Sequence, residues 1–246
     1  MSTDNQSLAG RTVLITGANR GLGGSLVEAA LNRGARRVYA GTRRPLSHPD
    51  KRVAPLQLDI TDAAQIDAAV KAIDELDMLI NNAGLAIYSD LADRPALEQQ
   101  LAVNVLGPYA VTHAFRDLLI ASAAGGSVVN VLSLAAIAPV PTAAGYSISK
   151  AAAFSLTQSL RMLLTPRGVR VHAVLAGPID TDMSRDLPIE KAAPDEVARA
   201  IFDGVAAGAE EIFPDPWSAN ALAEVWPTSP SKVLEQQNAA LVALLG

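Results

Sequence analysis

The sequence predicts an α/β fold in which a doubly wound parallel sheet carries helices on both faces. Two observations indicate it. Short apolar runs rich in β-branched residues alternate with helical stretches of three to five turns along the chain, and strands that are apolar on both faces are typical of parallel sheets. The 246 residues, half of them hydrophobic, are also enough to bury one sizeable core.

The elements follow one another without an internal repeat, linker or charged tail, so we expect a single domain over residues 1–246. The expected strands are 11–16, 36–42, 54–61, 77–84, 126–133, 169–177 and 211–214. The expected helices are 24–34, 62–76, about 95–122, 146–164, 194–207 and 229–245. Helix 62–76 repeats Ile66, Val70 and Ile73 at helical spacing, and we expect Thr61 to cap it.

Composition excludes several classes of function. The net charge of −5 gives no reason to expect binding to nucleic acid or to an acidic membrane surface. The chain has no cysteine, and its three histidines match no metal-ligand spacing, so we expect no metal. No apolar run could span a bilayer, and the N-terminus is polar. We therefore expect a cytoplasmic protein that acts away from membranes.

The first turn carries the first chemical signal. ITGANRGLGG joins the first strand to the first helix and contains Thr16, Gly17, Gly21 and Gly23. Glycines let the backbone approach a pyrophosphate, and the helix N-terminus offers free N–H groups to it. Glycine is also common in turns without a function, so the spacing alone is weak. Its position between a strand and a helix is the context that a dinucleotide site requires.

The end of the second strand indicates which dinucleotide. NAD sites commonly place an acidic residue there to bind the ribose 2′-OH, but this chain has GTRRP at 41–45. Arg43, after Thr42, and Arg20, in the glycine turn, could instead bind a 2′-phosphate, because guanidinium groups suit phosphate. The alternative is that both are solvated surface arginines. We expect NADP(H), with NAD(H) as a second possibility.

YSISK at 146–150 places Tyr146 and Lys150 one helical turn apart. A tyrosine with a pKa near ~10 is a poor proton-transfer group at neutral pH, and a neighbouring ammonium group favours the phenolate. We therefore expect Lys150 to lower the pKa of Tyr146 toward the working pH. Ser133, at the end of a strand, can donate to a carbonyl oxygen. Taken singly, a serine at the end of a strand is more often a turn former, and a tyrosine one turn from a lysine is more often a packed ring.

Together these motifs resemble the short-chain dehydrogenase/reductase superfamily in its compact single-domain branch. TGANRGLG is similar to its TGxxxGxG turn, NNAG at 81–84 to its next signature, and AGPIDT at 176–181 to its PGxIxT. Asn104, Ser133, Tyr146 and Lys150 fall in the order of its catalytic set. This chain has Ala176 where the family usually has proline, and this difference would loosen the turn slightly.

The resemblance implies a Rossmann-type fold whose cofactor half covers about 10–130 and whose catalytic and substrate half covers about 131–246. It implies that Asn104 holds a water linking Lys150 to solvent, and that the helices near 96–122 and 146–164 form a homodimer or homotetramer. The cofactor residues that we expect are Thr16, Gly17, Asn19, Arg20, Gly21, Leu22, Gly23, Thr42, Arg43, Asp59, Ile60, Asn82, Ala83, Gly84, Tyr146, Lys150, Gly177, Pro178, Ile179 and Thr181.

The expected function is that of an NADP(H)-dependent carbonyl reductase, which transfers hydride reversibly between the nicotinamide and a ketone or secondary alcohol. Enoyl reductases of this lineage place the lysine seven positions after the tyrosine, where this chain has Ala153. We expect a hydrophobic or bulky substrate in a pocket drawn from Leu85, Ala86, Leu134, Val140, Met183 and Leu187. The alternative is a catalytically silent NADP(H)-binding sensor, although such proteins typically lose the tyrosine or the lysine.

Overall fold

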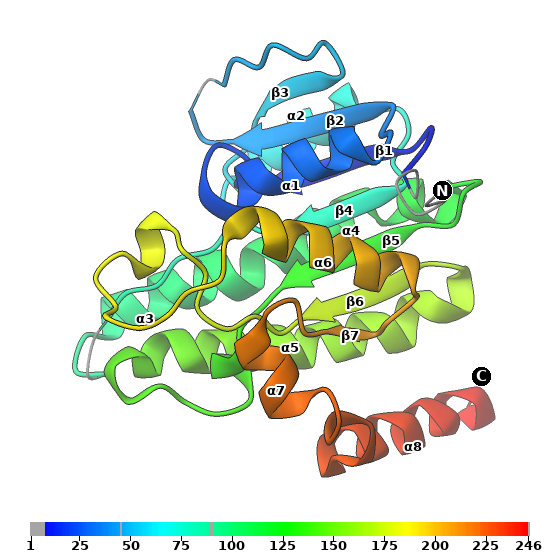
Figure 1. Cartoon of the computed structure of the whole chain (residues 1–246). Helices are drawn as coiled ribbons and strands as arrows, with labels where there is room; N and C mark the ends of the chain where they lie inside the picture. Colours follow the sequence, from blue (N-terminus) through cyan, green and yellow to red (C-terminus); the bar gives the residue numbers. More distant parts are fainter. Residues whose placement is uncertain (1–7, 45, 89–90, 246) are drawn as a thin grey trace, which may run out of the picture.

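Figure 1 shows the computed structural model, which describes residues 8–44, 46–88 and 91–245. Seven parallel strands form one sheet in the order β3-β2-β1-β4-β5-β6-β7. Their bounds are β1 Thr12–Thr16, β2 Arg37–Thr42, β3 Val53–Gln57, β4 Met78–Asn81, β5 Ser127–Val131, β6 Arg170–Val174 and β7 Glu211–Ile212. The predicted fold class is therefore confirmed.

Helices cover both faces of the sheet (Figure 1). α1 (Gly21–Asn32) and α6 (Pro194–Ala206) pack on one face, and α2 (Ala63–Ala72), α4 (Gly107–Ala121) and α5 (Ala144–Leu164) lie on the other. Alternate residues of a strand point to opposite faces. Val13 and Ile15 accordingly join the core under α1 and α6, and Leu14 joins the core under α2 and α4. Burial on both faces explains why the central strands are mainly apolar.

The strand order places the candidate site. β1 pairs with β2 on one side and with β4 on the other, so the chain winds outward in both directions from this point. In such sheets the loops at the carboxyl ends of the two central strands diverge and leave a crevice. Every loop discussed below leaves the sheet at this carboxyl edge (Figure 1).

Two local expectations near β3 are wrong. The strand expected over 54–61 ends at Gln57. Thr61 does not cap α2; Asp62 does, since its carboxylate accepts the N–H groups of Ala64 and Gln65. The hydroxyl of Thr61 instead donates to Asp59 at 2.7 Å. Aspartate is as good a capping residue as threonine, so the sequence offered two candidates one position apart.

The helical region expected over 95–122 is divided. α3 (Arg94–Leu101) and α4 are joined by a π-helical segment, Ala102–Leu106, that contains Asn104. Short π segments inside helices occur frequently at functional sites. The sequence analysis also missed α7 (Pro216–Leu222), a short helix that follows β7.

The C-terminal helix α8 (Pro230–Leu245) extends beyond the β7 edge of the sheet (Figure 1). A group of five charged residues, which we call the anchor cluster, attaches it to α5 and β7; the side chains of four are buried, and that of Glu210 is exposed. Its members are Arg161, Glu210, Glu211, Lys232 and Glu235. Arg161 Nη1 lies 2.8 Å from Glu211 and also pairs with Glu235, and Lys232 Nζ lies 3.0 Å from Glu211. The two cations therefore compensate two of the three carboxylates and leave the cluster with one formal negative charge.

Two kinds of feature are missing from the ranges that the structure describes. No group of three or more His, Asp or Glu side chains gathers there in a way that could hold a metal ion. None of the helices in those ranges is both long and apolar enough to cross a bilayer.

Candidate active site

The glycine turn after β1 has the close packing that a pyrophosphate cradle needs. Gly17 has a φ of +67°, a conformation that favours glycine. A Cβ on Gly23 would lie 2.0 Å from the carbonyl oxygen of Gly17, so only glycine lets α1 begin against the turn. The first turn of α1 then presents its free N–H groups at the carboxyl edge of the sheet. These residues fit the phosphates of a dinucleotide.

The NNAG segment locks this turn in place. The Thr16 hydroxyl accepts the N–H groups of Asn82 and Ala83, at 3.0 and 3.1 Å. In return, the Asn82 side-chain amide donates to the carbonyls of Thr16 and Gly17. Four hydrogen bonds thus join the loops after β1 and β4, which are 64 or more residues apart in sequence. Thr16 and Asn82 shape the candidate cofactor site through its backbone.

The remaining expected cofactor residues around the first turn and β2 differ in their placement. Asn19, Arg20 and Arg43 are exposed, whereas Leu22, Thr42 and Ile60 are buried. Ile60 packs against Gly107 of α4. The hydrogen bond from Thr61 and the charge of Arg43 lower the pKa of Asp59, so Arg43 and Asp59 lie near one another.

Arg20 has a partner that the sequence analysis did not anticipate. Its Nη1 lies 2.8 Å from Oδ2 of Asp182, in the segment after β6. Asp182 also pairs with Arg185. Both members of the Arg20–Asp182 pair are largely exposed, so the pair is weak and open to competition from a phosphate.

Ser133, Tyr146 and Lys150 meet at the carboxyl edge next to the locked turn. Ser133 follows β5, and α5 carries Tyr146 and Lys150 in its first two turns. The Lys150 ammonium lies 5.7 Å from the centre of the Tyr146 ring and donates to the Val131 carbonyl at 2.8 Å. A Cβ on Gly84 would lie 3.8 Å from the same ammonium. The structure thus brings the three residues and the end of NNAG together.

The expected lowering of the Tyr146 pKa is wrong for the residues of the chain alone. Burial raises the pKa of Tyr146 to about 12, the Ser133 hydroxyl opposes this by hydrogen bonding, and the Tyr88 phenol adds to it. Burial also lowers the pKa of Lys150 to about 8. Both groups are therefore pushed toward their neutral forms, because burial penalises charge. Lys150 is near the tyrosine ring but does not reverse this effect.

Asn104 is held in place by three hydrogen bonds. Its side chain accepts the Leu85 N–H at 2.8 Å and donates to the Leu85 carbonyl and to Ser149 Oγ, both at 2.8 Å. It therefore fixes the loop after β4 to the start of α5. Asn104 and Lys150 both line a cavity of about 10 Å³, roughly the room that one water molecule needs.

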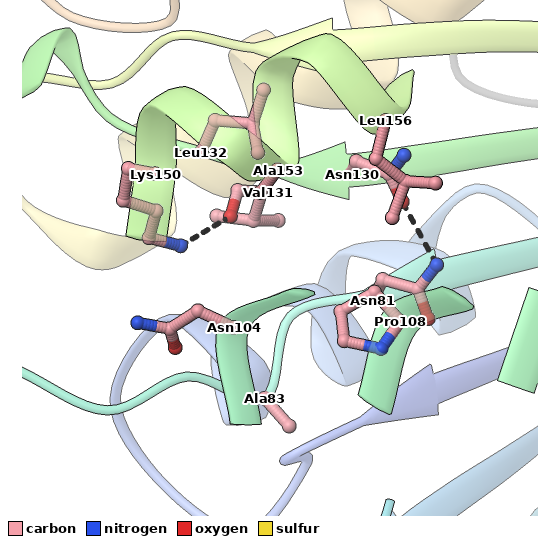
Figure 2. Close-up of a pocket in the computed structure, with 10 residues that line it drawn as sticks. All are labelled: Asn81, Ala83, Asn104, Pro108, Asn130, Val131, Leu132, Lys150, Ala153 and Leu156. Atoms are coloured by element: carbon pink, nitrogen blue, oxygen red, sulfur yellow. Dashed lines mark hydrogen bonds between the residues drawn. The ribbon is translucent and has the colours of Figure 1, made fainter. Parts of the chain in front are cut away.

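Figure 2 shows this cavity and two further polar residues that the sequence analysis missed. Asn81 on β4 donates to Asn130 on β5 at 2.8 Å and to Thr112 on α4 at 3.0 Å, and Asn130 donates to Thr157 on α5 at 2.9 Å. The Oδ1 of Asn81 has no partner among the described residues and belongs to the cavity wall. A buried polar atom beside such a cavity is a suitable acceptor for a water. The sequence contains both asparagines, in NNAG and SVVN. Their pairing could be predicted only by knowing that β4 and β5 are neighbours and that Asn81 lies opposite Asn130.

The AGPIDT turn after β6 is held from both sides. The Ala176 carbonyl accepts the Leu134 N–H at 2.9 Å, and the Gly177 N–H donates to Asp215 at 2.7 Å. The backbone N–H and carbonyl groups of residues 178–180 pair with Ala192. Thr181 caps the short helical turn Asp182–Ser184. Asp215 was not among the expected residues, and its signal was a capping pattern, D-x-x-S, in the loop before α7.

The fold and the site together define a dinucleotide-binding protein with a buried lysine and a tyrosine at its cofactor edge. A sequence model of the short chain dehydrogenase family matches residues 11–192. The chain belongs to the short-chain dehydrogenase/reductase family of oxidoreductases, which take a nicotinamide dinucleotide as cofactor.

Three relatives illustrate the similarity. Galactitol 2-dehydrogenase from Agrobacterium fabrum is 33% identical over 186 residues, which cover 70% of this chain and 72% of the relative. A short chain dehydrogenase from Burkholderia cenocepacia, solved in complex with NADP, is 37% identical with a TM-score of 0.84, covering 94% of this chain and 98% of that one. A 3-ketoacyl-(acyl-carrier-protein) reductase from Brucella melitensis, complexed with NADH, is 25% identical with a TM-score of 0.76, covering 84% and 97%.

Proposed function

We propose that this chain is an NADP(H)-dependent carbonyl reductase that interconverts a ketone and a secondary alcohol, with Asn104, Ser133, Tyr146 and Lys150 as its site residues. The observation that carries the proposal is the placement of Lys150. This buried lysine lies one turn from a tyrosine at the cofactor edge, and among the described residues it donates to the Val131 carbonyl and pairs with no carboxylate.

The protein residues suit the reductive direction. With its pKa raised to about 12, the Tyr146 phenol keeps its proton at neutral pH and can donate it to a substrate oxygen. Ser133 Oγ can donate a second hydrogen bond to the same oxygen as charge develops there. Lys150, with a pKa of about 8, is mainly a cation at neutral pH and stabilises the phenolate left on Tyr146. The bound nicotinamide supplies the hydride.

The test is turnover of a panel of ketones and secondary alcohols, followed by NADPH absorbance, in the wild type and in Tyr146→Phe. We expect turnover in the wild type and a loss of at least 10²-fold in kcat/KM in the variant, with NADPH affinity nearly unchanged. NADPH binding without any turnover across the panel would instead identify a cofactor sensor.

We also propose that the chain prefers NADP(H) to NAD(H). Arg43 and Arg20 support this, since both are exposed near the ends of β2 and β1 and no acidic residue ends β2. Arg43→Ala should raise the Kd of NADPH about tenfold and leave that of NADH within twofold, measured by fluorescence titration. Arg44→Ala, the neighbouring exposed arginine, is the matched control. An unchanged ratio of the two affinities in Arg43→Ala would make Arg43 an ordinary surface charge.

A homodimer or homotetramer is part of the same proposal. Leu106 and Leu163 are 61% and 66% exposed along the helices that the sequence analysis assigned to an interface. Leucines as exposed as these favour contact with another subunit. Light scattering of the wild type and of Leu163→Lys tests it, with a fall in mass expected for the variant.

A further inference from the structure

Two half-exposed aromatic side chains lie on segments that leave the carboxyl edge of the sheet, where the candidate active site lies. The chain has only ten aromatic residues, four Phe, four Tyr and two Trp. Three of them are about half exposed: Tyr88 (48%), Tyr109 (49%) and Trp217 (50%). Tyr109 lies on α4, whereas Tyr88 follows β4 and Trp217 follows β7, at the carboxyl edge. Aromatic residues exposed at a cleft commonly form part of a binding site.

Trp217 is fixed next to the cofactor turn. It lies in the first turn of α7, and a Cβ on Gly177 would come within 2.7 Å of its Cβ. The carboxylate of Asp215 holds both Gly177, through its N–H, and the N-terminus of α7, through Ser218. The carbonyl of Ala176 accepts the N–H of Leu134, so the backbone just after Ser133 also contacts the AGPIDT turn. Trp217 therefore lies beside the AGPIDT turn, on the same edge of the sheet as Ser133.

Tyr88 connects two of the segments at this edge of the sheet. Its hydroxyl donates to the Met183 carbonyl at 3.4 Å, which links the loop after β4 to the segment after β6. The pKa of Tyr146 is raised mainly by burial and, to a smaller extent, by the Tyr88 phenol. The pKa of Tyr88 is raised in turn by burial and by the Asp186 carboxylate. Tyr88 is therefore close to both the catalytic candidate and the acidic segment after β6.

Apolar and acidic side chains also lie at this edge. Ile137, Val140 and Met183 are each exposed by 40–45%. The segment 180–191 that borders the cleft carries four acidic residues against one arginine and one lysine. With Asp182 already paired to Arg20 and Arg185, the segment keeps a modest excess of negative charge, which disfavours acidic substrates. Exposed apolar side chains offer few partners for the many hydroxyl groups of a polyol.

We propose that Tyr88 and Trp217 are specificity-determining residues and that they select uncharged ketones bearing an aromatic ring next to the carbonyl. This inference rests on the proposed carbonyl reductase function. The carbonyl carbon accepts a hydride from NADPH, the π electron pair moves to the oxygen, and the oxygen takes the Tyr146 proton. An aryl ketone is thereby reduced to a secondary alcohol and NADPH is oxidised to NADP⁺. The aryl ring packs between the two aromatic walls.

The kinetic test compares acetophenone with cyclohexyl methyl ketone, which has a similar size without the aromatic ring, and with fructose. We expect the wild type to favour acetophenone over the other two. Trp217→Leu should lower kcat/KM for acetophenone about tenfold, mainly through KM, and change that for the cyclohexyl ketone less than threefold. Trp217→Phe and Tyr88→Phe keep a ring and should stay within about threefold of the wild type. Tyr109→Leu, which removes an equally exposed aromatic residue outside the cleft, is the control.

A binding test does not depend on turnover. Trp217 is half exposed and Trp226 is buried, so acetophenone added in the presence of NADP⁺ should quench the fluorescence of the wild type but not of Trp217→Phe. Calorimetry under the same conditions should still detect acetophenone binding to Trp217→Phe and much weaker binding to Trp217→Leu.

The outcomes separate the two proposals. Ketone turnover without a preference for acetophenone, or an equal loss for both ketones in Trp217→Leu, overturns the specificity inference and leaves the reductase intact. Absence of all turnover, with acetophenone binding that depends on Trp217, refutes the reductase and supports the aromatic site. Quenching that persists in Trp217→Phe would place the ligand elsewhere and refute the aromatic site directly.

Discussion

Lys150 and Lys232 are both about 6% exposed, yet their surroundings differ. Lys150 donates to one backbone carbonyl, and among the described residues no carboxylate pairs with it. Burial lowers its pKa to about 8. Lys232 contacts three carboxylates of the anchor cluster. Burial alone would lower the pKa of Lys232, but the hydrogen bond to Glu210 and the charge of Glu211 outweigh burial and raise it.

The difference shows how strongly counter-charges affect what a lysine with little exposed surface does. A buried cation surrounded by carboxylates is a structural connection, since each charge compensates the next. A buried cation without them costs stability. Such a cost is expected at functional sites, where perturbed pKa values cluster. Substitutions at the two lysines test whether they differ in this way.

Lys150→Met should reduce kcat/KM for ketone reduction by about 10³-fold, because the phenolate formed on Tyr146 loses its cation. The same substitution removes an uncompensated buried charge, so the free energy of unfolding should rise by about 1–2 kcal/mol despite the lost hydrogen bond to Val131. Steady-state kinetics and urea unfolding measure the two effects. An inactive variant that is also strongly destabilised would mean that Lys150 has a structural use, contrary to the comparison.

Lys232→Met should have the opposite profile. It leaves three carboxylates around Arg161 alone and should lower the free energy of unfolding by about 3–5 kcal/mol. The kcat/KM of the folded fraction should stay within about twofold. Adding Glu235→Gln, which removes one of the excess carboxylates, should recover part of the loss. A double variant less stable than the single one would show that the charges of the anchor cluster are not mutually compensating.

The stability of the wild type should respond to pH through Lys150. Its pKa is about 8 in the folded chain against 10.5 when exposed, so between these values the unfolded chain binds more protons. Stability therefore rises with pH in this window, by up to about 1.4 kcal/mol per pH unit from this group. Unfolding curves of the wild type and Lys150→Met between pH 7 and 10 isolate the contribution as their difference, which should shrink as the pH rises.

His172 provides the smallest effect. Burial lowers its pKa, and its Nδ1 contacts the Ala209 carbonyl at 2.6 Å while its Nε2 has no hydrogen-bond partner among the described residues. The folded chain holds this imidazole neutral, so its contribution to stability is complete above pH 6.5 and falls as the pH drops below that value. We expect the melting temperature of His172→Phe to decline less than that of the wild type between pH 6.5 and 5. Parallel declines would show that other groups control acid stability.

The fold could be predicted from sequence because its signals are local. Each strand is a short apolar run, and each longer helix repeats apolar residues at helical spacing. Strands that are apolar on both faces require helices on both faces of the sheet. The errors were local too. Asp62 and Thr61 are both good caps, and only the contact of Thr61 with Asp59 decides between them. α7 has seven residues, too few for a periodic pattern to stand out.

The site was predicted to the extent that its residues carry motifs. The glycine turn, NNAG, Ser133 and the Tyr146–Lys150 pair do so, and the structure brings them to one edge. Residues that act through contacts distant in sequence were missed. Asp215 meets Gly177 across 38 positions, and Asn81 meets Asn130 across 49. The direction of the Tyr146 pKa was missed because spacing reveals a neighbouring cation but not how much water both groups lose.

The double role of Asp215 limits how this chain can be altered. One carboxylate fastens both the backbone at Gly177 and the helix that carries Trp217. Exchanging the whole 215–222 segment for a relative's version without an acid at its first position would loosen the AGPIDT turn, which holds expected cofactor residues, along with the helix that carries Trp217. New substrate ranges should therefore be sought by changing the side chain at 217 while the segment beneath it is kept.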